Sequence, residues 1–137
     1  MGERRVRIAP DANVMARAMA GDDPDQSARA KAELAAAETI ALGTTMLCEL
    51  VWVLARGYRV PAREIAVAIR RAIEAENVVV DRLAVEAGLA MLENGGDFAD
   101  GAIAHEGRTL GAEVFVSFDR TAVRLSRASG QQARLPA

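Results

Sequence analysis

Short apolar runs alternate with longer amphipathic segments along the chain. Four of the runs have the length and the β-branched residues of strands, at residues 6–10, 39–42, 78–80 and 114–118. Seven helices are predicted between and after them. The pattern is clearest in the fourth, where Ile65, Ile69 and Ile73 recur every four residues along one face. This alternation predicts an α/β fold with a mostly parallel sheet of four to five strands flanked by helices, the tail after Gly130 supplying the optional edge strand.

Residues that begin and end helices set the expected bounds of these elements. Asp23, Pro24 and Gln26 form the pattern of a capping box at the start of the second helix. Thr44 or Thr45 is expected to cap the third helix. The seven helices are expected at residues 13–20, 24–38, 45–57, 61–76, 82–93, 98–111 and 120–128.

Composition places the chain among ordinary globular proteins. Its 137 residues, 51% apolar and 26% charged, predict one domain over residues 1–137. Apolar runs are too short for a signal peptide or a membrane span, and Cys48 is the only cysteine. We therefore expect a soluble, cytoplasmic protein with no membrane partner. The net charge of −2 means that a nucleic-acid partner would need a local basic patch.

Two groups of residues could contact a partner, one a nucleic acid and the other a protein, although each group has a structural alternative. Arg63, Arg70 and Arg71, with Arg56 and Arg59 nearby, could contact RNA phosphates, but a solvated helical face explains them as simply. Trp52 and Tyr58 could anchor a partner protein, but packing in the core is the expected role for both.

Four carboxylates lie where a parallel sheet presents its ligands. Asp11 follows the first strand, Asp119 follows the fourth, and Asp100 falls in the first turn of the sixth helix. Glu49 lies within the apolar run 46–54 of the third helix. We infer that these four side chains converge to hold a divalent metal ion.

Helix capping is the competing explanation for the aspartates. Asp11, Asp97 and Asp119 stand where helices begin, and any one of them taken singly is better explained as an N-cap. Glu49 decides the balance, because its neighbours in the sequence are apolar and we expect it to be buried. A buried, ionised carboxylate requires a partner, either an arginine or a metal ion, and the three acids at strand ends favour the metal.

The chemistry of the four acids indicates which metal they would bind. Two carboxylates about 4 Å apart repel each other by roughly 4 kcal/mol at an effective dielectric constant near 20, so four together need a cation. A site built only from oxygen donors suits Mg²⁺ or Mn²⁺ and disfavours zinc. Sites of this kind commonly hydrolyse phosphate esters.

Four segments of the chain, taken in order, carry a family resemblance. They are Asp11-Ala12-Asn13, the run 48–54 around Glu49, the run 97–104 with Asp97 and Asp100, and Val116-Ser117-Phe118-Asp119. Together they resemble the PIN-domain ribonucleases, and most closely the VapC toxins of bacterial toxin–antitoxin pairs. The resemblance covers almost the whole chain and implies a PIN-like three-layer sandwich.

The resemblance also implies a set of site residues. The family's acidic quartet falls on Asp11, Glu49, Asp100 and Asp119, with Asp97 as an accessory ligand or a cap. Asn13 and Ser117 match the family's accessory polar positions. The implied function is that of a Mg²⁺-dependent endoribonuclease that cuts structured RNA, either tRNA or rRNA. The implied partners are a cognate antitoxin and a second copy of the chain.

Two departures from the family pattern support a different function. Position 12 is alanine where a hydroxyl residue is usual, and Pro10 precedes the first aspartate. The alternative is therefore a catalytically weak PIN-fold module that acts only as the antitoxin's partner in gene regulation. A phospho-receiver ranks last, because the only lysine, Lys31, precedes the second strand.

Overall fold

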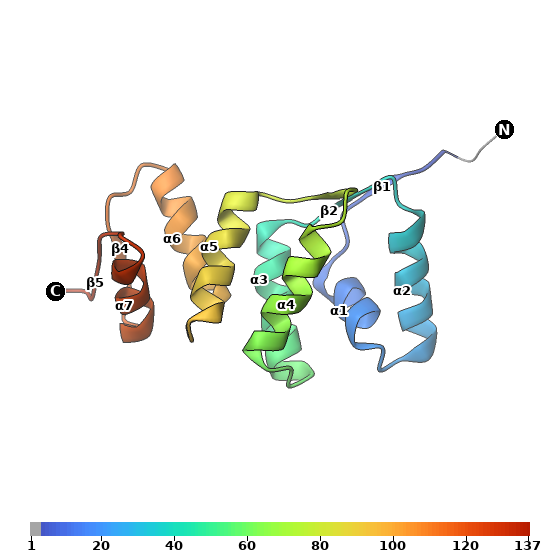
Figure 1. Cartoon of the computed structure of the whole chain (residues 1–137), viewed down its shortest axis with the longest axis horizontal. Helices are drawn as coiled ribbons and strands as arrows, with labels where there is room; N and C mark the ends of the chain where they lie inside the picture. Colours follow the sequence, from blue (N-terminus) through green and yellow to red (C-terminus); the bar gives the residue numbers. More distant parts are fainter. Residues whose placement is uncertain (1–3) are drawn as a thin grey trace. The chain divides into compact units, whose positions relative to one another are not determined.

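The computed structural model describes residues 4–137, and the chain divides into two compact units (Figure 1). The first unit runs to Val80 and the second begins at Asp81. The first contains β1 (Arg7–Ile8), α1 (Ala12–Ala20), α2 (Pro24–Ala36), β2 (Thr39–Ala41), α3 (Thr44–Trp52), the π-helical turn η1 (Val53–Gly57), α4 (Ala62–Ile73) and β3 (Val78–Val79). The second contains α5 (Arg82–Glu93), α6 (Phe98–Thr109), β4 (Phe115–Val116), α7 (Arg120–Ala128) and β5 (Ala133–Arg134).

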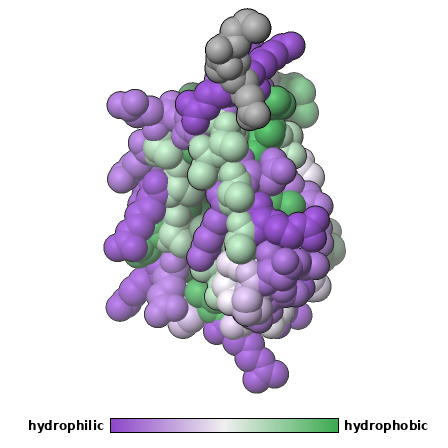
Figure 2. All heavy atoms as spheres, turned by 90° about the vertical axis from the view of Figure 1, so that its right-hand side faces the viewer, coloured by the Kyte–Doolittle hydropathy of each residue, from purple (hydrophilic) through white to green (hydrophobic). Residues whose placement is uncertain are grey.

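The sheet of the first unit is parallel throughout, in the order β1-β2-β3. Arg7 lies opposite Thr39, and Ile40 lies opposite Val78. Parallel neighbours need long crossover connections, and here the helices supply them: α1 and α2 lie between β1 and β2, and α3, η1 and α4 lie between β2 and β3. Figure 2 views this unit from the side of α2 and shows hydrophilic side chains (purple) with small hydrophobic ones (pale green) between them.

The core of the first unit forms where apolar helix faces meet. The helix α1 packs against both α2 and α3 and buries Met15. The helix α4 buries Ile65, Ile69 and Ile73, each no more than 3% exposed, so the four-residue spacing in the sequence marked the core face correctly.

The second unit is organised around close contact between two helices. The helices α5 and α6 approach so closely that a Cβ on Gly88 would lie 2.6 Å from the ring of Phe98. Phe98 is fully buried and fills the space that Gly88 leaves. Beside this pair, α7 packs on α5, α6 and a two-stranded parallel sheet in which Phe115 of β4 lies opposite Ala133 of β5.

The predicted α/β class with parallel strands is confirmed, and so is the additional strand in the tail. The described residues form five strands, three in the first unit and two in the second, and each is shorter than its apolar run. The bounds of α5 and α7 agree with the prediction, whereas α4 ends at Ile73 because the chain turns there to enter β3. The prediction of one domain over residues 1–137 stays a prediction.

One detail of the third helix was predicted wrongly. Gly43 is the N-cap of α3, with no side-chain capping bond, and Thr44 is its first helical residue.

Among the residues that the structure describes, no helix is long and apolar enough to cross a bilayer.

Candidate functional site

Three of the predicted acids stand at helix starts in the second unit. Asp97 is the N-cap of α6, and its carboxylate accepts a hydrogen bond from the backbone N–H of Ala99 at 3.4 Å. Asp100 follows in the first turn of α6. Asp119 is the N-cap of α7 and accepts from the N–H of Ala122 at 3.1 Å. The helices α6 and α7 pack together, and the charges of both Asp97 and Asp119 act on Asp100.

Electrostatics couples these three carboxylates. Asp100 is half-buried, and this burial is the largest of the causes that raise the pKa of its carboxyl. The negative charges of Asp97 and then Asp119 raise the pKa of Asp100 further. The three acids therefore share a negative field that opposes ionisation at Asp100, and a cation would relieve this repulsion.

Ser117 contributes to the position of Asp119. Its hydroxyl oxygen accepts a hydrogen bond from the backbone N–H of Asp119 at 3.0 Å, which fixes the chain between β4 and α7. Since the carboxylate of Asp119 also accepts from α7, the residue is held from both sides. The accessory role predicted for Ser117 has a physical basis in this contact.

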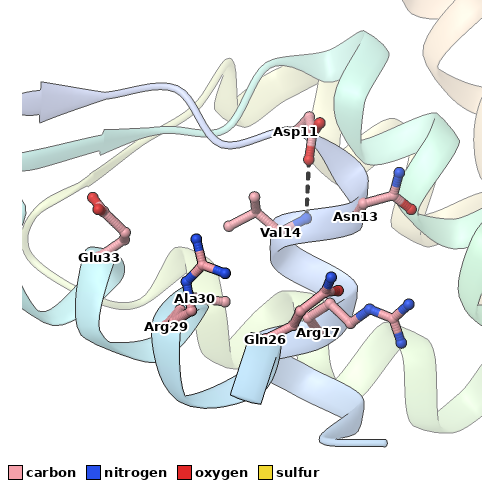
Figure 3. Close-up of a pocket in the computed structure, with 8 residues that line it drawn as sticks. All are labelled: Asp11, Asn13, Val14, Arg17, Gln26, Arg29, Ala30 and Glu33. Atoms are coloured by element: carbon pink, nitrogen blue, oxygen red, sulfur yellow. Dashed lines mark hydrogen bonds between the residues drawn. The ribbon is translucent and has the colours of Figure 1, made fainter. Parts of the chain in front are cut away.

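The first unit holds Asp11 and Asn13 beside a pocket. Asp11 is the exposed N-cap of α1, and its carboxylate accepts from the N–H of Val14 at 2.9 Å. Figure 3 shows Asp11 and Asn13 on α1, with Arg29 and Glu33 on the facing helix α2. The pocket has a volume of about 350 Å³ and is lined by Asp11, Asn13, Val14, Arg17, Gln26, Arg29, Ala30 and Glu33.

The structure corrects the expected burial of Glu49. Glu49 is exposed on α3, because Leu47, Leu50 and Val51 alone form the buried face of that helix. A nearly continuous apolar run therefore does not mean that the helix is surrounded by protein. Burial of an unpaired charge cannot serve as an argument for a metal at Glu49.

The expectation that Trp52 packs in the core was also wrong. The Trp52 side chain is 61% exposed, three residues after Glu49 on the same helix. Tyr58 is half-buried, and its hydroxyl makes polar contacts.

The capping explanation for the aspartates is confirmed for Asp11, Asp97 and Asp119. Capping does not exclude a role as a ligand, because the bond to the helix engages only one oxygen of each carboxylate and the other stays available. A strand-end aspartate can therefore be oriented by its helix and still face a ligand.

The predicted quartet draws on both units. Asp11 and Glu49 belong to the first unit, and Asp100 and Asp119 belong to the second. Taken by itself, neither unit gathers three histidine, cysteine, aspartate or glutamate side chains closely enough to hold a metal ion, as far as residues 4–137 are concerned. A single metal centre formed by all four acids stays a prediction.

One polar network in the first unit was not predicted. The Nη1 of Arg17 donates to both carboxylate oxygens of Asp22, at 2.8 and 2.9 Å, and to the hydroxyl of Tyr58 at 3.1 Å. Tyr58 in turn donates to Asp22 at 3.1 Å. These bonds tie the loop after α1 to the end of η1, and the bond from Arg17 is the main cause that lowers the pKa of Asp22. Because Tyr58 lies 36 residues from Asp22, no local sequence pattern could have revealed the network.

Comparison with known families identifies the fold. The model of the family described as "PIN domain" matches residues 8–128, a range that includes all of the predicted site residues. The comparison with curated proteins found no match. PIN domains are generally nucleases that use divalent metals such as Mg²⁺, and oxygen donors such as those of Asp97, Asp100 and Asp119 suit such ions. The match covers most of the chain and agrees with the parallel α/β architecture. The chain therefore belongs to the PIN-domain family.

Proposed function

We propose that this protein is a Mg²⁺-dependent endoribonuclease of the VapC type, the toxin of a toxin–antitoxin pair. The observation that carries the proposal is the acidic cluster of the second unit, in which Asp97 and Asp119 raise the pKa of the half-buried Asp100. Helix capping explains Asp97 and Asp119, but it does not explain the half-buried Asp100, because the charges of the two caps oppose its ionisation. Its position in a PIN domain, a family of nucleases, gives it a function.

The chemistry of the donor set fits a hard divalent cation. Asp11, Glu49, Asp100 and Asp119 would hold Mg²⁺ or Mn²⁺, with Asp97 as an accessory ligand, and all of these donors are carboxylate oxygens. A bound Mg²⁺ would stabilise negative charge on the scissile phosphate and make water a better nucleophile.

The chain's own groups would orient these ligands. The N–H groups at the starts of α1, α6 and α7 each hold one oxygen of Asp11, Asp97 and Asp119. The hydroxyl of Ser117 fixes the backbone at Asp119, and Asn13 is exposed two residues after Asp11, where its amide can donate to a phosphate. Ligands oriented before a cation arrives lose less freedom when it binds.

The substrate and partners follow the VapC resemblance. We propose that the protein cuts a structured RNA, tRNA or rRNA, in the cytoplasm and leaves a 5′-phosphate and a 3′-hydroxyl. It would act as a homodimer, and a cognate antitoxin would block the acidic site with an arginine. Trp52, exposed one turn from Glu49, is suited to anchor that antitoxin.

Thermal unfolding with Mn²⁺ or Mg²⁺ tests the metal chemistry. The wild-type protein should gain several degrees in Tm, and Asp100→Asn should lose most of that gain. The matched control is Asp81→Asn, because Asp81 caps α5 in the same unit but does not contribute to the raised pKa of Asp100. Sequencing of 5′ ends after incubation with bulk tRNA and rRNA then tests cleavage. A wild-type protein whose Tm responds to neither ion contradicts the proposal.

The alternative of a catalytically weak binding module has one structural observation in its favour. Ala12 is 1% exposed and opens α1 directly after Asp11, so no side-chain hydroxyl is present at this buried position. The variant Ala12→Thr discriminates between the two functions. If Ala12→Thr cuts RNA and the wild-type protein does not, the binding module is correct.

A further inference from the structure

Four arginines gather on one surface of the second unit, whereas the arginines singled out from the sequence belong to the first unit. Arg120, Arg124 and Arg127 lie on α7, and Arg134 lies on β5. Together with Val123 and Leu135 they line a depression of about 470 Å³. We call these four residues the arginine patch.

No acid offsets the charge of the arginine patch. Every charged side chain after Asp119 in the sequence is one of these four arginines. In the described part of the chain, ion pairs form at Arg7, Arg17 and Arg29 among other residues, and none is seen at the patch. The pocket beside Asp11, by contrast, is lined by acids as well as arginines. In a protein with a net charge of −2, the patch is a concentrated site of positive charge.

Helix stability explains Arg127, a cation in the last turn of α7, but it does not explain Arg120 or Arg124. Arg120 is the first residue of α7, where the helix dipole disfavours a cation. Arg124 lies four residues later and Arg127 three residues after that, so like charges adjoin along one face of the helix, and such pairs destabilise helices. The local cost at Arg120 and Arg124 is the reason to look for a negatively charged partner.

One member of the patch is already oriented. The Nε of Arg127 donates to the backbone carbonyl of Ala133 at 2.7 Å, which holds the guanidinium between α7 and β5. Its two terminal nitrogens keep four donors for another ligand. A guanidinium fixed in this way recognises a phosphate group with little loss of side-chain freedom.

We propose that the arginine patch binds the phosphate backbone of the RNA substrate. This inference rests on the proposed function and adds the surface that positions the RNA. Arg120 directly follows Asp119, so a strand bound on the patch would reach the acidic cluster within the same unit. An anionic membrane is the competing partner, because basic clusters also attract anionic lipid, but the patch belongs to a PIN domain and directly follows Asp119, which favours RNA.

Binding to bulk tRNA in a buffer with EDTA tests the inference, because no cleavage occurs there. Arg120→Gln/Arg124→Gln should weaken binding at least about tenfold, as expected for loss of charge-assisted contacts. The slope of log K against log salt should fall by about 1.4, roughly 0.7 for each lost contact to a single strand. Lys31→Gln/Arg108→Gln is the matched control, because it removes two exposed cations outside the patch. The control should bind as the wild-type protein does.

Further variants test whether lost binding comes from the lost charges or from a misfolded α7. Arg134→Gln changes β5 and leaves α7 intact, and it should also weaken binding. Arg120→Lys/Arg124→Lys retains the charges and should retain most of the affinity. Equal affinity and slope for the wild-type protein and the Arg120→Gln/Arg124→Gln variant overturn the inference. So does a variant that loses binding to phosphatidylserine vesicles but not to tRNA.

Cleavage assays with Mg²⁺ separate this inference from the proposed function. If the patch variants lose tRNA binding and the wild-type protein cuts no RNA, the patch is a nucleic-acid surface and the nuclease proposal fails. If the wild-type protein cuts RNA and the patch variants bind and cut equally well, the nuclease proposal stands and the inference about the patch is wrong.

Discussion

At the scale of single residues, the aspartates of this chain have one observed task and one proposed task. Asp11, Asp97 and Asp119 each cap a helix, and the resemblance to PIN nucleases assigns them to a metal site. The sequence could predict both roles but could not separate them, because both require a carboxylate between a strand and a helix. What the sequence could not give is the coupling at Asp100, which depends on α6 and α7 packing together.

Two substitutions at Asp119 distinguish its role as a helix cap from its proposed role as a charged metal ligand. Asparagine caps a helix as well as aspartate, so Asp119→Asn should keep the stability of the metal-free protein. Asp119→Ala removes the bond to the N–H of Ala122 and should cost about 1 kcal/mol in the free energy of unfolding, measured in urea. Both variants should lose the Mn²⁺-induced rise in Tm. If Asp119→Asn keeps that rise, Asp119 is a cap and nothing more.

The raised pKa of Asp100 predicts how stability depends on pH without metal. A carboxyl whose pKa is higher in the folded protein favours folding while it is protonated, below its ordinary value of 3.8. That contribution is lost as pH rises through the raised value. In EDTA, Asp100→Asn should therefore be more stable than the wild-type protein at pH 7, and the difference should vanish as pH falls below about 3.8. Urea unfolding between pH 3 and pH 7 measures this, and a difference that grows at low pH contradicts it.

The pKa of Asp22 is shifted in the opposite direction to that of Asp100, so the two residues can be compared within one protein. Its pKa is lowered, first by the hydrogen bond from Arg17, so its contribution is present above the ordinary value of 3.8 and is lost as pH falls through the lowered value. Tyr58→Phe removes one donor to Asp22 and should shift the pKa of Asp22 back upward, as read by NMR titration. An unchanged pKa would mean that Arg17 alone holds the carboxylate.

At the scale of elements, the apolar run 46–54 shows the limit of pattern reading. The sequence predicted a helix with little solvated surface, yet α3 exposes Glu49 and Trp52. Its buried face needs only one side of the helix, and hydrophobic residues on the surface are common. The chain then continues into η1, where the N–H of Tyr58 bonds the carbonyl of Val53. Nothing in the local sequence indicated this π-helical turn.

The contact between α5 and α6 gives a prediction at this scale. A Cβ at Gly101 would overlap the carbonyl oxygen of Ala87, which is backbone and cannot rotate away. Gly101→Ala should therefore cost about 1–3 kcal/mol in the free energy of unfolding, as overpacked cores do. Gly107→Ala on the same helix is the control, because its Cβ would meet the Cβ of Ala112 at 3.8 Å and alanine favours helices. Chemical denaturation should show destabilisation for the first variant only; equal stability would mean that the helices can separate at little cost.

At the scale of the whole molecule, the quartet joins residues from the two ends of the chain. The alternation of strands and helices predicted the α/β class and most helix bounds, because these depend on local periodicity. The proposed convergence of Asp11 and Glu49 with Asp100 and Asp119 involves both units and has no local signal in the sequence. The resemblance to a family supplied that step.

Hydrogen exchange with and without Mn²⁺ tests whether one cation engages both units. If all four acids bind it, Mn²⁺ should slow exchange in α1 and in α6 alike. At a concentration of 100 Kd, the free energy of opening should rise by up to about 2.7 kcal/mol in both helices. Glu49→Gln changes only the first unit and should reduce the protection of α6 as well. The control Glu33→Gln, an exposed acid on α2 outside the quartet, should leave both effects in place. If Mn²⁺ protects α6 alone and Glu49→Gln has no effect, the acids of the second unit bind the cation without Asp11 and Glu49. The metal centre then belongs to residues 81–137, and the quartet proposal is wrong.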